Sequence, residues 1–168
     1  MRIGIVYDSI FGNTAQVAVA IETALKPEHR VQCVTVQDAG TLPLADLDLL
    51  ILGSPTRGFR PTPLMADYAD RIGAAPRSMQ VAVFDTRMDL STIRAAPLRW
   101  AMDVGGYAAA RLADAARRQG FAIRGDPIGL LVTGSQGPLK PGALLEASQW
   151  ARRLPFSAAA HVPGAVEG

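Results

Sequence analysis

Short apolar runs alternate with amphipathic segments along most of this 168-residue chain, and this alternation limits the possible folds more than any other feature. The runs predict strands over residues 3–7, 31–36, 47–52, 80–84 and 128–132. Five strands interleaved with helices are typical of an α/β fold. We therefore expect an open parallel sheet with helices on both faces and right-handed crossovers.

The segments between these strands carry apolar residues at helical spacing and have recognisable ends. We expect helices over residues 13–26, 62–72, 106–119 and 142–154. The second begins with Thr62-Pro63, a favoured cap-then-proline order, and the third is closed by Gly120. The elements predict a single domain over residues 1–154 and a loose Ala-, Gly- and Pro-rich tail over residues 155–168.

Composition excludes several classes of protein. The net charge is only +2 and the basic residues are scattered, which does not favour nucleic-acid binding. Cys33 is the only cysteine and the two histidines are isolated, so we expect neither a disulfide framework nor a metal site. No apolar stretch approaches the roughly 18 residues that a membrane span needs, and we expect no signal peptide before the first strand. We expect a cytoplasmic protein.

A turn that carries hydroxyl groups and a glycine joins the first strand to the first helix. Free N–H groups and the positive end of a helix dipole would face a ligand in this turn, which suits a phosphate. It contains no Lys or Arg, so neutral donors would hold the phosphate; alternatively, the turn only caps the helix. The candidate phosphate-binding residues are Ser9, Ile10, Phe11, Gly12, Asn13 and Thr14.

Two further candidate loops follow the third and fourth strands. Ligands of open parallel sheets bind beyond the carboxyl ends of the strands, so these loops are expected to join the first turn. Residues 53–61 form the first loop; Asp85-Thr86-Arg87 begins the second, which runs to about residue 105 and includes Trp100. In the alternative interpretation Phe59 and Trp100 pack locally and Arg57 is an exposed charge.

The first turn lacks the GxxxxGK[ST] and GxGxxG motifs, but it resembles the flavodoxin phosphate loop, Thr/Ser-x-Thr-Gly-x-Thr. Phe11 departs from that pattern, because the family has a hydroxyl residue at this position. Together with the GSPTRGF loop, the FDTR turn and the strand layout, the turn makes residues 1–154 similar to the flavodoxin-like family. The resemblance implies a three-layer α/β/α sandwich, a five-stranded parallel sheet of order 2-1-3-4-5 and noncovalent FMN.

The resemblance also implies a role for each loop. Residues 9–14 would hold the ribityl phosphate, and a peptide flip at Gly58 would offer a carbonyl to flavin N5. Arg57 or Arg87 would raise the second reduction potential. The segment 134–142 also lies at the ligand edge and is interpreted mainly as a turn into the last helix; in the alternative interpretation it contacts the flavin or the substrate. One wall of the flavin site would comprise Pro55, Thr56, Arg57, Gly58 and Phe59; the pyrimidine end would face Asp85, Thr86 and Arg87; Trp100 would form a second wall.

Several functions remain open at this point. The favoured one is electron transfer through FMN to a redox partner protein or a small-molecule acceptor. The alternatives are an FMN-dependent NAD(P)H:quinone-type oxidoreductase and a binding module that has lost the cofactor. In the oxidoreductase, Met88 and Met102 would line the substrate pocket instead of packing in the core. A phosphate-switched receiver is disfavoured, because Gly53-Ser54 stands where it needs an aspartate. The oligomeric state is left open.

Overall fold

The computed structural model, which describes residues 1–89, 91 and 106–156, has a five-stranded parallel sheet as its middle layer. The strand order β2-β1-β3-β4-β5 confirms the predicted flavodoxin-like α/β architecture. Trp100 and most of the predicted tail lie outside the described residues. The strands are β1 (Arg2–Tyr7), β2 (Arg30–Thr35), β3 (Leu49–Pro55), β4 (Gln80–Met88) and β5 (Ile128–Val132).

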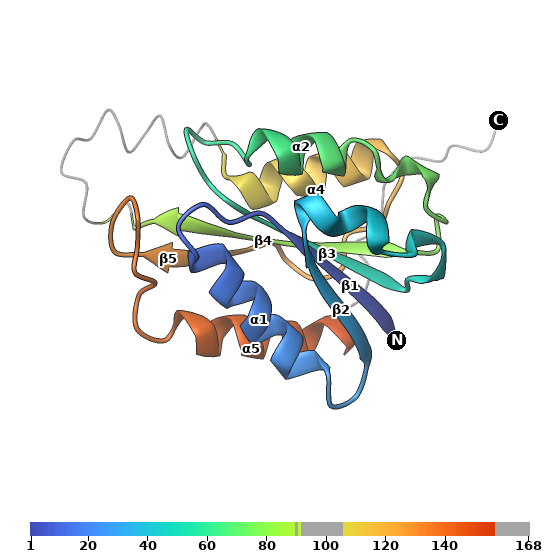
Figure 1. The fold of residues 1–168 in the computed structure, drawn as a ribbon, viewed down its shortest axis with the longest axis horizontal. Helices are drawn as coiled ribbons and strands as arrows, with labels where there is room; N and C mark the ends of the chain where they lie inside the picture. Colours follow the sequence, from blue (N-terminus) through green and yellow to red (C-terminus); the bar gives the residue numbers. More distant parts are fainter. Residues whose placement is uncertain (90, 92–105, 157–168) are drawn as a thin grey trace.

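Helices cover both faces of this sheet. Helices α1 (Asn13–Leu25) and α5 (Ala143–Arg153) lie on one face, and α2 (Pro63–Ala69) and α4 (Ala108–Arg118) lie on the other (Figure 1). Thr62 caps α2, as predicted, by accepting a hydrogen bond from the Met65 amide at 3.4 Å. No helix in the described ranges is long and apolar enough to cross a membrane.

Two hydrophobic cores hold the three layers together. Alternate residues of the central strands point to opposite faces, so Ile3 and Ile51 pack against α1 and α5, whereas Leu50 and Leu52 pack beneath α2 and α4. These strand side chains are fully buried. Burying one such side chain contributes about 2 kcal/mol, which explains the near-continuous apolar sequences of the central strands.

Strand β4 extends beyond its predicted end at residue 84. The apolar run stops there, but parallel pairing continues from Phe84–Ile128 to Met88–Val132. Asp85 and Thr86 therefore lie in a buried strand, and the prediction of a turn at Asp85-Thr86-Arg87 is wrong. The pattern failed here because these polar side chains are buried with hydrogen-bonding partners.

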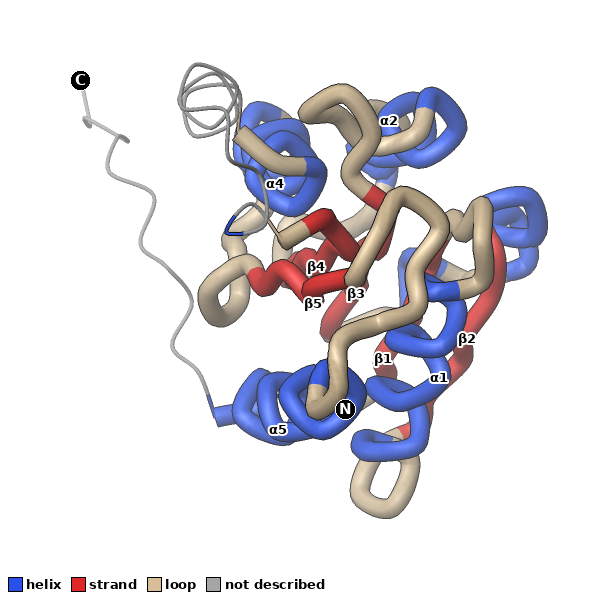
Figure 2. Tube along the Cα trace, turned by 90° about the vertical axis from the view of Figure 1, so that its left-hand side faces the viewer, coloured by secondary structure: helices blue, strands red, loops and turns tan. Residues whose placement is uncertain are grey.

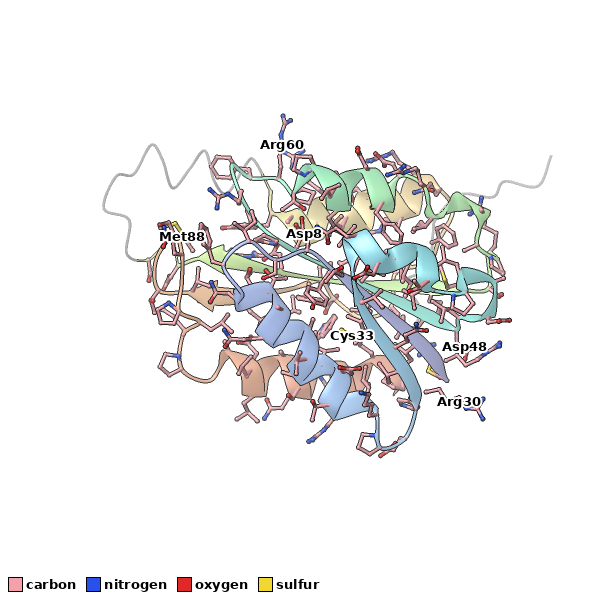
Figure 3. The ribbon with its side chains drawn as sticks, in the orientation of Figure 1. Asp8, Arg30, Cys33, Asp48, Arg60 and Met88 are labelled. Carbon is pink, nitrogen blue, oxygen red and sulfur yellow. The ribbon has the colours of Figure 1, made fainter. Side chains whose placement is uncertain are left out.

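The carboxyl ends of the strands meet at one edge of the sheet. Figure 2 shows this edge facing the viewer, with the segments that follow β1 and β3 arching beside β4 and β5. Met88 lies at this edge, whereas Arg30 and Asp48 lie at the opposite end (Figure 3). Loops that are far apart in the sequence are thereby brought to a common site.

Close packing between β3 and β4 gives a test of the fold. A Cβ atom at Gly53 would lie 2.0 Å from Phe84 Cζ, and that ring is itself packed edge-on against Trp150. We expect Gly53→Ala to lower the free energy of unfolding by about 3 kcal/mol through overpacking. Gly40→Ala is the control, because a Cβ there meets no atom within 4 Å. Urea denaturation measures both, and equal effects would contradict the packing described here.

Candidate functional site

A cavity of about 230 Å³ opens at the carboxyl edge of the sheet. Its walls come from the turn after β1, the loop after β3, the end of β4 and the segment after β5. These are the segments that the switch-point rule predicts for a ligand site in an open parallel sheet. The lining residues are Ile10, Phe11, Asn13, Thr14, Pro55, Thr56, Arg57, Gly58, Thr86, Arg87, Met88, Val132 and Ser135.

The turn after β1 leaves a row of backbone donors unused. Gly12, the residue preceding α1, has a left-handed φ of 86° and provides no side-chain cap. Within the described part of the chain, no hydrogen bond uses the amides of residues 10–14. Ser9 Oγ accepts a bond from the Ala15 amide at 3.2 Å and so holds the turn against the helix. The free amides and the positive end of the helix dipole together favour an anion here.

Two buried side chains at the start of α1 fix the turn to the rest of the edge. Asn13 Nδ2 donates to the Gln136 carbonyl at 3.0 Å, which ties α1 to the segment after β5. The hydroxyl groups of Thr14 and Thr86 are hydrogen-bonded at 2.8 Å. Thr86 is buried in β4, so this contact positions the helix N-terminus directly over the end of the sheet.

The loop after β3 is a tight hairpin. Arg57 and Arg60 exchange two backbone hydrogen bonds of 2.9 and 3.0 Å, and Gly58 and Phe59 between them both have positive φ, of 52° and 65°. Two consecutive positive φ values are typical of a type I′ turn. A bulky side chain disfavours this conformation, so Phe59 is strained by about 1 kcal/mol. Arg111 Nε donates to the Phe59 carbonyl at 2.7 Å and stabilises the strained turn.

A cation–π contact joins the hairpin to the turn after β1. The Arg57 guanidinium lies 5.4 Å from the centre of the Phe11 ring, and both side chains line the cavity. Phe11 and Ile10 are roughly half exposed, at 45% and 49%. Phe11, which departs from the flavodoxin loop pattern, therefore supplies an apolar wall in place of a hydroxyl donor.

Beneath the cavity, the Asp85 carboxylate has several hydrogen-bonding partners. Its fully buried carboxylate accepts two bonds from Arg87, of 2.6 and 2.8 Å, and one of 2.9 Å from the Ala109 amide. Thr56 also hydrogen-bonds to the Asp85 carboxylate, and Thr56 Oγ1 accepts a bond from the Ala108 amide. Burial raises the pKa of Asp85, while the bonds from Arg87, Ala109 and Thr56 lower it.

Arg87 is held in place by its surroundings. Its guanidinium lies 3.7 Å from the centre of the Tyr107 ring, on the N-terminal side of α4. On β5, Gly129 leaves the space that the guanidinium occupies, because a Cβ there would lie 2.2 Å from Arg87 Cζ. The bidentate pair with Asp85 balances the charge of Arg87 at the cavity wall.

The structure brings most of the predicted site residues together, with a few differences. Ser9 and Gly12 shape the turn, and neither they nor Phe59 line the cavity. Asp85 lies below the wall and holds Arg87 and Thr56. The cavity residues that were predicted are Ile10, Phe11, Asn13, Thr14, Pro55, Thr56, Arg57, Gly58, Thr86 and Arg87.

Three lining residues were not among the predicted site residues. Met88 is 39% exposed at the cavity, so the core-packing interpretation is wrong for this methionine. Val132 and Ser135 belong to the end of β5 and the segment after it. Their position beyond a strand end was the available signal, but their residue types carry no motif.

Neither a metal site nor a reactive thiol is found among the described residues. No group of three His, Cys, Asp or Glu side chains among them is placed to hold a metal ion. Cys33 lies on β2, and burial raises the pKa of its thiol to about 12, which makes it a poor nucleophile at neutral pH. The cavity at the carboxyl edge is therefore the candidate functional site.

Comparisons with solved structures agree with this architecture. A flavodoxin from the domain Archaea superposes with a TM-score of 0.72 at 21% sequence identity, covering 93% of this chain and 97% of its own. Flavodoxin 1 from Bacillus cereus gives 0.68 at 17% identity, with 95% and 100% covered. Rubredoxin:oxygen oxidoreductase from Desulfovibrio gigas gives 0.68 at 16% identity, but only 35% of that chain is covered. No protein-family model and no curated protein matches the sequence. The chain has the flavodoxin-like fold.

The buried ion pair gives a test of how the site is held. Asp85→Asn removes the counter-ion of Arg87, whose side chain is only 20% exposed, so we expect a loss of about 3 kcal/mol in the free energy of unfolding. Arg87→Met and the double variant complete a double-mutant cycle. We expect the double variant to lose clearly less than the sum of the two single variants. Additive losses in denaturant unfolding would show that the pair does not stabilise this edge.

Proposed function

We propose that this chain is an FMN-binding electron-transfer protein. The observation that carries the proposal is the row of unused amides at residues 10–14, which faces a cavity whose other wall is the Arg57–Arg60 hairpin. The structural similarity to flavodoxins supports the same function. The neighbouring Thr14 and Ser135 hydroxyl groups extend the set of donors.

The donor set fits a phosphate group that is held without a direct cation. Residues 10–14 contain no Lys or Arg, and the amides of a helix N-terminus bind phosphate through hydrogen bonds and the helix dipole. Thr14 is buried beside these amides and would donate to the phosphate or share its hydrogen with Thr86. A ligand without a phosphate would lose most of these contacts.

The remaining walls fit a planar ring system. Pro55, Thr56 and Gly58 form one side of the cavity, and Arg57 and Phe11 close the side near the turn. Bound FMN would supply the redox chemistry, while the protein would set its binding, orientation and electrostatic surroundings. Since Asp85 balances the charge of Arg87, Arg57 is the wall arginine expected to raise the reduction potential.

Flavin affinity tests the phosphate site directly. We expect the apoprotein to bind FMN and to bind riboflavin, which lacks the phosphate, at least about a hundredfold more weakly. Thr14→Val should weaken FMN binding about tenfold, because it removes one hydroxyl donor to a charged group. Thr23→Val is the matched control, since Thr23 is exposed on the same helix and its hydroxyl donates to the Val19 carbonyl.

Quenching of flavin fluorescence measures these affinities, and circular dichroism confirms that each variant is folded. Equal affinity for FMN and riboflavin would show that the turn does not bind the phosphate. Failure to bind FMN at all would overturn the proposed function and leave the binding-module interpretation.

The conformation of the Arg57–Arg60 hairpin bears on whether the protein is a one-electron carrier or a two-electron enzyme. Gly58 is exposed, has positive φ and has no atom of the described residues within 4 Å of its Cβ position, so the adjoining peptide has room to turn. We therefore expect reductive titration of the FMN-loaded protein to show two separate one-electron steps. Gly58→Ala should bring the steps closer together, whereas Gly120→Ala, another positive-φ glycine, should not. A single two-electron step in the unmodified protein would favour the oxidoreductase alternative.

A further inference from the structure

A second concave surface lies between α2 and α4, behind the hairpin. It has a volume of about 460 Å³ and an apolar floor. Three arginines and one aspartate are the charged residues among its described lining. The lining residues are Arg60, Pro61, Pro63, Ala66, Ala69, Asp70, Arg111, Leu112, Ala115 and Arg118, which we call the α2–α4 groove.

Positive charge dominates the rim of this groove. Arg60, Arg111 and Arg118 are all exposed. Asp70 lies 3.9 Å from Arg118, but both side chains are more than 60% exposed, so solvent screens this pair strongly. Arg111 Nε donates to the Phe59 carbonyl, which holds this side chain at the groove wall.

The groove and the candidate flavin site are joined by one hairpin. Arg57 lines the cavity and Arg60 lines the groove, and the two residues are paired through the backbone of one hairpin. Arg111 connects the groove wall on α4 to the same hairpin. A protein seated in the groove would therefore contact the loop that forms one wall of the cavity.

We propose that the α2–α4 groove is the docking surface for the acidic face of a redox protein that exchanges electrons with this chain. The proposal rests on the proposed function, since an electron carrier needs a partner bound near its cofactor. An apolar floor surrounded by arginines has the composition of a protein interface, in which Arg is enriched and the rim is polar. The charge of the rim selects carboxylates on the partner and speeds their encounter.

The sign of the charge makes the proposal testable with two carriers. The probes are a strongly acidic [2Fe–2S] ferredoxin and a basic c-type cytochrome, each titrated calorimetrically into the full chain at low and at physiological salt. We expect the ferredoxin to bind, more weakly as salt is added, and the cytochrome not to bind. The double variant Arg60→Glu/Arg118→Glu should weaken ferredoxin binding about tenfold.

Arg30→Glu is the matched control. Arg30 is an exposed arginine at the end of the molecule opposite the candidate site, and Arg60 projects from the α2–α4 side (Figure 3). We expect less than a twofold change in ferredoxin affinity from Arg30→Glu. An equal loss in this variant would show non-specific attraction and overturn the proposal, as would preferential binding of the cytochrome or no binding of the ferredoxin.

Two further outcomes would assign the groove to a different occupant or separate docking from cofactor binding. Self-association of the chain that the double variant abolishes would assign the groove to a second copy and overturn the proposal. Running each titration with and without FMN separates the two proposals of function and docking. If the groove binds the ferredoxin but no FMN binds, the electron-transfer function falls and the docking surface stands; if FMN binds and the ferredoxin does not, the docking surface falls.

Discussion

The fully buried carboxylate of Asp85 holds the carboxyl edge of the sheet together. It pairs with Arg87 on its own strand, accepts the Ala109 amide at the start of α4, and contacts Thr56 at the base of the hairpin. A carboxylate buried without partners would be very costly, so these groups must remain in place for the fold to be stable. The walls of the candidate site are therefore built on an interaction that also stabilises the protein.

The site combines neutral hydrogen-bond donors in the turn after β1 with charged side chains that lie outside this turn. The turn after β1 offers backbone amides and hydroxyl groups, and the positive charge of Arg87 is balanced by Asp85. Further positive charge lies farther out, on Arg57 and on the rim of the α2–α4 groove. If both proposals hold, this arrangement would separate binding of a cofactor phosphate, which would use hydrogen bonds, from attraction of an acidic partner, which would use long-range charge.

Much of the fold could be predicted from the sequence because apolar runs and helix ends are local signals. The limits of β5 agree with the prediction, and Thr62-Pro63 begins α2 as expected. The extension of β4 could not be predicted from hydrophobicity, since Asp85 and Thr86 are polar and are buried only because distant partners satisfy them. Because β4 was expected to end at residue 84, Asp85 was placed in a loop facing the ligand, although it lies beneath the cavity wall. Ser135 reaches the cavity through tertiary packing that no local pattern records.

Backbone NMR can show whether the amides of residues 10–14 hold the phosphate of FMN. In ¹⁵N-labelled apoprotein these amides have no protein partner within the described residues. Addition of FMN should move their proton resonances downfield, as charge-assisted hydrogen bonds form, while amides of β2 at the far edge of the sheet stay unchanged. Binding of FMN that leaves the resonances of residues 10–14 unmoved would show that these amides do not hold its phosphate.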